Sequence, residues 1–184
     1  NDYEFQGLYK SVDSGTTFVK TASTTNILES NQAWFDLALE VSPTNANELY
    51  VGCLNIWKSS NGGTFFTSKN SWFSNNAAYT HADIHTIKFF GNKLFVGSDG
   101  GIYVSENGAD TFTDKTSNLE ISQFYRVSVA EKNSNKIIGG LQDNGGFVLN
   151  NNLWNNYHGG DGMDNVIDPN NENLIYGFSQ NGGS

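Results

Sequence analysis

Several common residues and patterns are scarce or missing in this sequence of 184 residues. A single cysteine, Cys53, excludes an internal disulfide. The formal net charge is −9 and Arg126 is the one arginine, which excludes the clustered basic surface needed for nucleic acid or an anionic membrane. No run approaches the roughly 18 consecutive apolar residues of a membrane helix, so we expect no membrane insertion.

Proline is scarce too, and no asparagine stands in an Asn-x-Ser/Thr sequon, which disfavours a eukaryotic glycoprotein. Glycine, asparagine, serine and threonine are abundant instead, and they suit short strands joined by tight turns. Lysine and asparagine at this frequency fit an AT-rich bacterial genome. Because the chain starts at Asn1, we expect any export signal to have been removed or omitted. The composition therefore predicts an all-β protein.

Three kinds of segment repeat in the same order along the chain. The most visible is a serine-centred motif whose serines, Ser11, Ser59 and Ser105, are 48 and 46 residues apart. Each repeat reads as four short strands, which we name A to D from the channel outward. In the second repeat we expect these strands at Trp34–Val41, Leu49–Cys53, Ile56–Ser59 and Thr64–Thr67.

Four antiparallel strands at this period describe one blade of a β-propeller. The sequence predicts about four blades of a larger ring of seven or eight. Residues 1–25 would end one blade, 33–73, 79–116 and 122–157 would form three more, and 161–184 would start another. Open blade edges invite pairing. We therefore expect the remaining blades to come from the parent chain or from a second chain.

The serine-centred motif has a mechanical interpretation at the C–D hairpin. Ser11 and Asp13 would hydrogen-bond the backbone of the turn, Gly15 tolerates a positive φ, and Phe18 would pack back into the blade. Later copies replace the aspartate by asparagine, which keeps the capping role. The corresponding structural residues are Ser59, Asn61, Gly63 and Phe66, and then Ser105, Asn107 and Phe112. The fourth repeat, Phe147 to Trp154, has a shortened hairpin without this motif.

Propeller geometry places the D–A and B–C loops together at one end of the blades, which we call the mouth end; the A–B turns and C–D hairpins form the turn end. The mouth end would hold five ligand-binding candidates: His81, Asp83, His85, Gln142 and His158. In a strand, the first three would project to one side. This pattern suits a His/Asp metal site or an acid–base pair; equally, Asp-Gly-Gly and Asp-Asn-Gly are ordinary turns. We expect no metal or cofactor; calcium stays open, although no EF-hand or RTX-like spacing occurs.

The sequence resembles the Asp-box (BNR-like) propeller proteins secreted by bacteria of Bacteroidetes type, which are similar in architecture to the sortilin/Vps10 propeller and to the xyloglucanases of glycoside hydrolase family 74. Four segments carry the resemblance: His81–His85, Val96–Tyr103, Gly140–Gly146 and Gly159–Asp164 with Asp168-Pro169. It implies the same fold and a secreted or cell-surface location in bacteria. The group contains hydrolases, receptors and proteins with no established activity, so the fold does not select among them.

Two functions follow from this resemblance. The first is a module that binds a glycan or a protein at the channel mouth. The alternative is a xyloglucanase-like hydrolase, for which Asp161 resembles the family's acid. Its partner would be Asp143, Asp99 or a carboxylate of the absent blades, at a separation of roughly 5–10 Å. A sialidase is disfavoured because Arg126 is alone. We interpret Trp34, Trp57, Trp72 and Trp154 as blade-packing residues.

Overall fold

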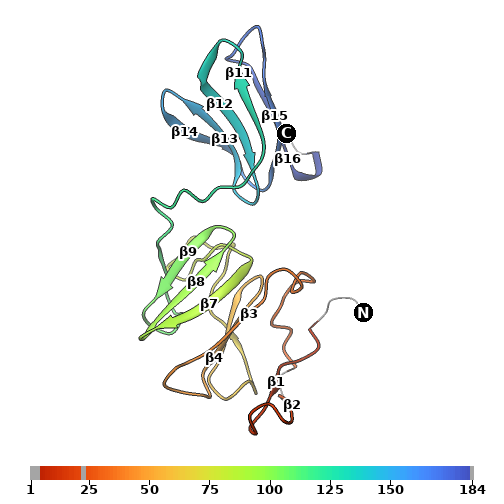
Figure 1. Ribbon diagram of the computed structural model, residues 1–184, viewed down its shortest axis with the longest axis vertical. Coiled ribbons are helices and arrows are strands. Elements are labelled where there is room, and N and C mark those ends of the chain that lie inside the picture. The colour runs from red at the N-terminus through yellow and green to blue at the C-terminus, as the bar shows by residue number, and fades with distance from the viewer. Residues whose placement is uncertain (1–4, 22–23, 183–184) are drawn as a thin grey trace. The chain divides into compact units, whose positions relative to one another are not determined.

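The computed structural model describes residues 5–21 and 24–182. Residues 1–4, 22–23 and 183–184, which belong to the first and last predicted blades, lie outside the described part. The described residues form sixteen β-strands and one short 3₁₀ helix, Gln180–Gly182 (Figure 1). Among them there is no helix long and apolar enough to cross a membrane. The chain divides into two compact units, Asn1–Asn118 and Leu119–Ser184, which we call unit 1 and unit 2.

Unit 1 contains one strand pair and two four-stranded sheets. The pair joins β1 (Tyr9–Lys10) and β2 (Val19–Lys20). The first sheet has the order β3 (Ala38–Val41), β4 (Leu49–Gly52), β5 (Ile56–Ser59) and β6 (Thr67–Ser68). The second has the order β7 (Ile84–Phe90), β8 (Lys93–Ser98), β9 (Gly101–Ser105) and β10 (Thr113–Asp114).

Unit 2 contains one four-stranded sheet and a strand pair. The sheet runs β11 (Phe124–Ala130), β12 (Asn133–Leu141), β13 (Gly145–Asn150) and β14 (Leu153–His158), and the pair joins β15 (Gly162–Ile167) and β16 (Ile175–Ser179). All strand pairs of the chain are antiparallel and consecutive. The predicted fold class is therefore confirmed: the chain is all-β and is built from four-stranded antiparallel propeller blades.

The core of unit 1 lies between successive blades. Strand β7 packs against β3 and β4, so that Ile84 and Ile87 lie in a buried cluster with Tyr50 (Figure 1). This close approach requires a glycine, because a Cβ on Gly52 would lie 2.5 Å from a methyl carbon of Ile84. A second cluster, which includes Leu49, Val51 and Phe66, forms on the other face of the same sheet.

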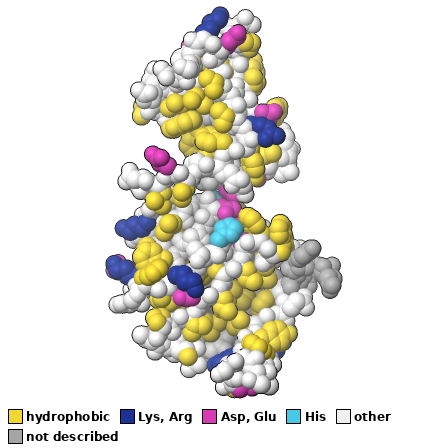
Figure 2. Space-filling view, viewed as in Figure 1, with side chains coloured by type: hydrophobic (Ala, Val, Ile, Leu, Met, Phe, Trp, Pro, Cys, Tyr) yellow, Lys and Arg dark blue, Asp and Glu magenta, His cyan; other side chains and the backbone are white. Residues whose placement is uncertain are grey.

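Unit 2 repeats this arrangement on a smaller scale. Ala130 and Ile138 from the sheet pack against Ile167 of β15. Within unit 2 taken alone, hydrophobic side chains lie on the opposite face of the sheet, as Figure 2 shows. The exposed apolar residues of strands β11 and β14 are Phe124, Val127, Val129, Leu153 and Trp154.

A shared hydrogen-bond pattern closes the three serine-centred hairpins. In the first, the Ser11 hydroxyl donates to Asp13 Oδ1 (2.7 Å) and accepts from the Gly15 amide (2.8 Å), while Asp13 Oδ1 accepts from the Thr17 amide (2.8 Å). These contacts from Thr17 and Ser11 lower the pKa of Asp13 to about 2.

The second and third hairpins repeat this pattern with asparagine. The Ser59 hydroxyl donates to Asn61 Oδ1 (2.9 Å) and accepts from the Gly63 amide (3.0 Å). The Ser105 hydroxyl donates to Asn107 Oδ1 (3.0 Å) and accepts from the Ala109 amide (2.9 Å). Gly15, Gly63 and Ala109 all have positive φ, and asparagine supplies the same acceptor atom as aspartate. The fourth hairpin turns through Asn151 and Asn152, both at positive φ.

Several details of the predicted strands are wrong. Trp34–Leu37 form a turn, closed by the Phe35 and Asp36 amides on the Gln32 carbonyl, so strand A begins only at Ala38. Strand B ends at Gly52, and strand D begins at Thr67 rather than Thr64, because Asn61 still caps the Phe65 amide.

The expectation for Phe18 is also wrong. Its side chain is 63% exposed, whereas Phe66 is buried at 2% and Phe112 packs partly against a core cluster. The first hairpin belongs to a two-stranded pair. It therefore offers less sheet surface for its phenylalanine than a four-stranded blade does.

Candidate functional site

At the mouth end of unit 1, the segment from His81 to His85 does not form the regular strand that we expected. Asp83 has a φ of 61°, in the left-handed region, and β7 begins only at Ile84. The three predicted side chains therefore do not project to one side. Ala82 and Ile84 are buried between them, and His85 is exposed.

The polar side chains of this segment bond within the protein. His85 Nε2 lies 2.6 Å from Asp99 Oδ1, which brings one histidine and one candidate catalytic aspartate together. The Asp99 amide donates to the Asp83 carbonyl (3.3 Å). His81 Nδ1 lies 3.2 Å from the Ala82 carbonyl oxygen. Asp99 thus holds the His85 ring in place.

Behind this loop lies a buried polar group that the sequence analysis missed. Asp36 is fully buried, and its carboxylate accepts from Gln32 Nε2 (2.9 Å) and from the Cys53 thiol (3.6 Å). Gln32 Nε2 also donates to Asp83. Burial, then the charges of Asp36 and Asp99, raise the pKa of Asp83 to about 6. Burial raises the pKa of Cys53 to about 11, so this thiol is no nucleophile at neutral pH.

Exposed aromatic rings lie beside His85. Trp34 is 73% exposed and Phe35 54% exposed, so the interpretation of Trp34 as a packing residue is wrong. The Trp34 and Phe35 ring centroids are 5.8 Å apart, and Phe35 meets His85 edge-on at 5.0 Å. We call Trp34, Phe35 and His85 the aromatic platform.

The other tryptophans differ from one another. Trp57 is partly buried against the core and donates to Glu29 (3.1 Å), and Trp72 stacks on Phe73 at 3.6 Å. Trp154 is 47% exposed, which contradicts its interpretation as a packing residue.

In unit 2, the candidate acid Asp161 has a structural role. Its Oδ1 accepts a hydrogen bond from the Asp143 amide (2.7 Å), its amide donates to the Gln180 side chain, and its carbonyl accepts from the Gln180 amide (3.0 Å). The Asp161 carboxylate therefore joins the B–C loop of one blade to the start of the next. Asp143 has a φ of 57° in this turn.

The other two candidates of unit 2 are held differently. Gln142 is bonded through its backbone: its amide donates to the Gln123 carbonyl (3.0 Å), and its carbonyl accepts from the Asn144 side chain (2.9 Å). His158 Nδ1 lies 2.9 Å from the Gly159 carbonyl, and its ring meets Tyr157 edge-on at 4.8 Å. His158 Nε2 is buried and has no hydrogen-bond partner among the described residues. A Cβ on Gly146 would lie 2.7 Å from this nitrogen, so the ring is packed closely against the sheet.

In the described part of each unit taken alone, no three His, Cys, Asp or Glu side chains bring their ligand atoms close enough to share one ion. The mouth end thus offers carboxylates that cap amides and orient a histidine.

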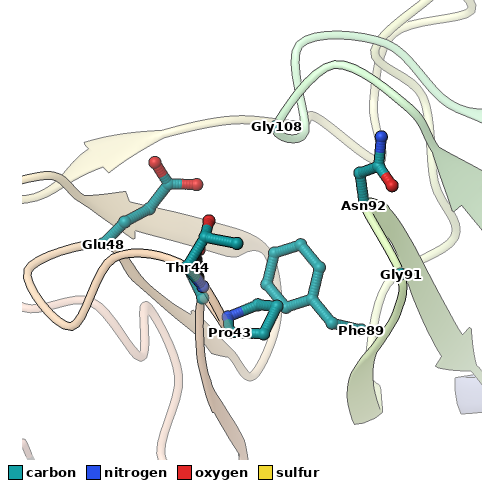
Figure 3. A pocket seen from close by; sticks show the side chains of 8 residues that line it. Pro43, Thr44, Glu48, Phe89, Gly91, Asn92 and Gly108 are labelled. Carbon is teal, nitrogen blue, oxygen red and sulfur yellow. Dashed lines mark hydrogen bonds between the residues drawn. The ribbon is translucent and has the colours of Figure 1, made fainter.

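A cavity of unit 1 lies at the turn end, where the sequence predicts no candidate residue. It has a volume of about 520 Å³ and opens between two successive blades (Figure 3). The A–B turn of one blade, the A–B turn of the next and the hairpin of that second blade form its walls. The lining residues are Ser42, Pro43, Thr44, Glu48, Phe89, Gly91, Asn92 and Gly108. We call this cavity the turn-end pocket.

No protein-family model matches the sequence, and no curated protein does. An ancestral GH74 enzyme superposes with a TM-score of 0.44 at 22% identity, over 96% of this chain and 25% of that chain. The GH74 enzyme of Niastella koreensis gives 0.45 at 20% identity, over 96% and 32%. YCF48 bound to D1 peptide gives 0.39 at 11%, over 92% and 54%. This chain covers less than two thirds of each protein, and the fold is assigned here from its own strand order and register.

Proposed function

We propose that this chain is a carbohydrate-binding β-propeller module that holds its ligand without cleaving it. The observation that carries the proposal is the aromatic platform at the mouth end of unit 1. The faces of aromatic rings are electron-rich, and they attract the polarised C–H groups on the apolar face of a sugar ring. Large exposed apolar groups of this kind mark binding surfaces more often than isolated apolar residues do.

The His85 imidazole, which meets the Phe35 ring edge-on, supplies a hydrogen-bonding group for sugar hydroxyls. Because Asp99 orients the His85 ring, the position of this edge of the platform is fixed before a ligand arrives. A preorganised side chain loses less conformational entropy on binding. The proposed site therefore combines a stacking surface of Trp34 and Phe35 with the imidazole of His85.

Hydrolysis fits the geometry less well. A glycosidase needs two carboxyl groups that face the scissile bond, one of them held protonated near neutral pH. Asp161 instead accepts a backbone amide, and Asp99 bonds His85. The carboxyl group with a raised pKa, Asp83, lies against buried Asp36 and accepts from Gln32. We therefore propose binding rather than catalysis.

We further propose that the chain is a member of the Asp-box propeller group and acts outside a bacterial cell. The three hairpins with a common hydrogen-bond pattern support this membership. Further blades, from the parent polypeptide or a second chain, would complete the strand pairs β1–β2 and β15–β16, which have two strands where a blade has four.

Affinity electrophoresis tests the proposed function. Gels that contain xyloglucan, β-glucan, mannan or xylan should retard the wild-type chain in at least one case. Trp34→Ala should weaken that retardation at least tenfold, because it removes the largest ring of the platform. Trp154→Ala, which removes an exposed tryptophan from unit 2, is the matched control and should bind as the wild type does.

Three results would contradict the proposal. Absence of retardation in all four gels, or unchanged retardation of Trp34→Ala, removes the platform as a glycan site. Release of reducing sugar that disappears in Asp161→Asn would establish the hydrolase instead.

A further inference from the structure

The turn-end pocket has a mixture of surfaces that suits a small polar ligand with one apolar face. In Figure 3 the Pro43 and Phe89 side chains lie next to each other in the middle, with Glu48 on one side and Asn92 on the other. Phe89 is held by an edge-on contact with the buried Tyr50 ring, at 5.6 Å between centroids. The apolar floor of the pocket is therefore rigid.

The polar groups around this floor are oriented as well. Glu48 Oε1 accepts from the Tyr50 hydroxyl (2.6 Å) and lies 3.3 Å from Lys58 Nζ. None of the described residues donates to Glu48 Oε2, or bonds the side-chain amide of Asn92. The Ser42 and Thr44 hydroxyls lie 3.3 Å apart on the wall. The pocket thus presents a carboxylate oxygen, an amide and two hydroxyls to solvent.

Its charge favours a neutral ligand. Lys58 neutralises Glu48 and also lies 3.5 Å from the Gly108 carbonyl, so it is anchored within the wall. No other ionisable side chain lines the pocket. A cation would have to compete with Lys58 for Glu48, and an anion would face the carboxylate. A neutral group that donates and accepts hydrogen bonds meets neither penalty.

We propose that the turn-end pocket is a second binding site, for one neutral hexose unit of a glycan. The apolar face of the sugar would lie on Phe89 and Pro43, and its hydroxyls would bond Glu48 Oε2 and the Asn92 amide. The volume of about 520 Å³ is within the usual range for small-molecule pockets and accommodates one such ring with water. The site lies at the opposite end of the strands from the aromatic platform, so one chain would hold a glycan at two places.

Unit 2 contains a natural contrast. A cavity of about 390 Å³ lies at the corresponding A–B turns, but its lining includes Glu131, Lys132, Asp168 and Glu172 and no aromatic ring. A proline, Pro169, is present there as in the turn-end pocket. The two cavities therefore differ in the stacking surface and in charge, and we expect only the turn-end pocket to take a sugar.

Site-resolved NMR titration of the whole chain tests the inference. The probes are the neutral tetrasaccharides cellotetraose, maltotetraose, mannotetraose and galactotetraose. At least one should shift the Asn92 side-chain amide signal, in a saturable way. Phe89→Leu keeps apolar volume against Tyr50 but removes the flat ring, and should weaken this binding at least tenfold. Asn92→Ala should weaken it about fivefold, followed on the Gly91 amide, and the matched Asn170→Ala in the unit 2 cavity should leave it unchanged.

The outcomes separate this inference from the proposed function. Shifts at the Trp34 indole without shifts around Asn92 overturn the turn-end site and keep the platform. Shifts around Asn92 without shifts at Trp34 support the turn-end site and count against the platform. If no tetrasaccharide shifts either region, or if Phe89→Leu binds as the wild type does, the turn-end site is refuted. Trilysine that shifts the pocket where no sugar does would make it a site for cationic side chains instead.

Discussion

The two ends of the blades in unit 1 use their polar side chains in opposite ways. At the mouth end, Asp36, Asp83 and Asp99 are occupied by Gln32, Cys53 and His85. At the turn end, Asn92 and one oxygen of Glu48 face an open pocket. At the mouth end, the charged and histidine-containing loops therefore bond residues within the protein. At the turn end, the A–B turns leave polar side chains available to a ligand.

The serine-centred hairpins lie at the turn end, but their polar side chains are bonded within the protein, as those of the mouth end are. Substitutions in these hairpins give the largest expected loss of stability. Ser59 is fully buried and satisfies the Gly63 amide. Ser59→Ala leaves that buried amide without a partner and should cost about 2 kcal/mol of the free energy of unfolding of unit 1. Ser11→Ala breaks the same bonds in an exposed hairpin, where water replaces them, and should cost about 0.5 kcal/mol. Urea denaturation of the two variants checks this; equal losses would show that burial of the hairpin does not matter.

A somewhat smaller effect is expected for Asp161. The Asp161 carboxylate accepts a hydrogen bond from the Asp143 amide and so joins two loops. Asp161→Ala removes this acceptor and should lower the free energy of unfolding of unit 2 by about 1.5 kcal/mol. Hydrogen exchange of the Asp143 amide should become faster in this variant. Glu172→Ala is the control and should change the free energy of unfolding by less than about 0.5 kcal/mol. An unchanged exchange rate of the Asp143 amide would mean that the Asp161 carboxylate does not hold this amide, and Asp161 would again be a candidate catalytic acid.

The pH dependence of unit 1 tests the buried carboxyl pair. The pKa of Asp83 is raised from 3.8 to about 6 in the folded chain, so the folded state holds this proton more tightly than the unfolded state. The stability that protonation provides is present below about pH 4 and is lost as the pH rises to about 6. Above that pH the ionised carboxylate is half-buried and lies near the charges of Asp36 and Asp99.

Asp83→Asn should remove this loss. Asparagine tolerates the left-handed φ of Asp83 and still accepts from Gln32. At pH 7 the variant should be more stable than the wild type, by on the order of 1 kcal/mol, and the difference should vanish towards pH 4. Thermal unfolding of both chains between pH 4 and pH 7 measures it. A constant difference over this range would mean that Asp83 does not titrate there.

Much of the fold was predictable because each blade repeats the same local rules. Three serines at nearly constant spacing, each with Asp or Asn two residues later, are enough to locate the hairpins, and the apolar segments between them locate the strands. Strand ends were less predictable. The turn at Trp34–Leu37 depends on amide bonds to the Gln32 carbonyl, which hydrophobic alternation does not reveal.

The site was less predictable than the fold, because its residues meet through loops from different blades. The sequence predicted that His85 and Asp99 lie at the same end of the blades. It could not show that Asp99 would bond His85 rather than face a ligand. One feature of the sequence could have identified Asp36 as a buried polar residue, because it is an aspartate within an apolar segment. Nothing local marked the turn-end pocket, whose walls come from a hairpin and two A–B turns, represented by Thr44 and Asn92, 48 residues apart.

The smallest expected effect provides the sharpest test of the comparison between the two ends. Asn92 is exposed, and its side chain bonds none of the described residues, so Asn92→Ala should change the free energy of unfolding by less than about 0.5 kcal/mol. Asp161→Ala, in contrast, removes an internal bond. If Asn92→Ala lowered the free energy of unfolding by more than about 1 kcal/mol, the Asn92 side chain would stabilise the blades, as the polar side chains of the mouth end do. The turn-end pocket would then be a consequence of how the blades pack and not a binding site. If Asn92→Ala folds as the wild type does but binds sugar more weakly, the Asn92 side chain contributes to ligand recognition and not to the stability of the blade.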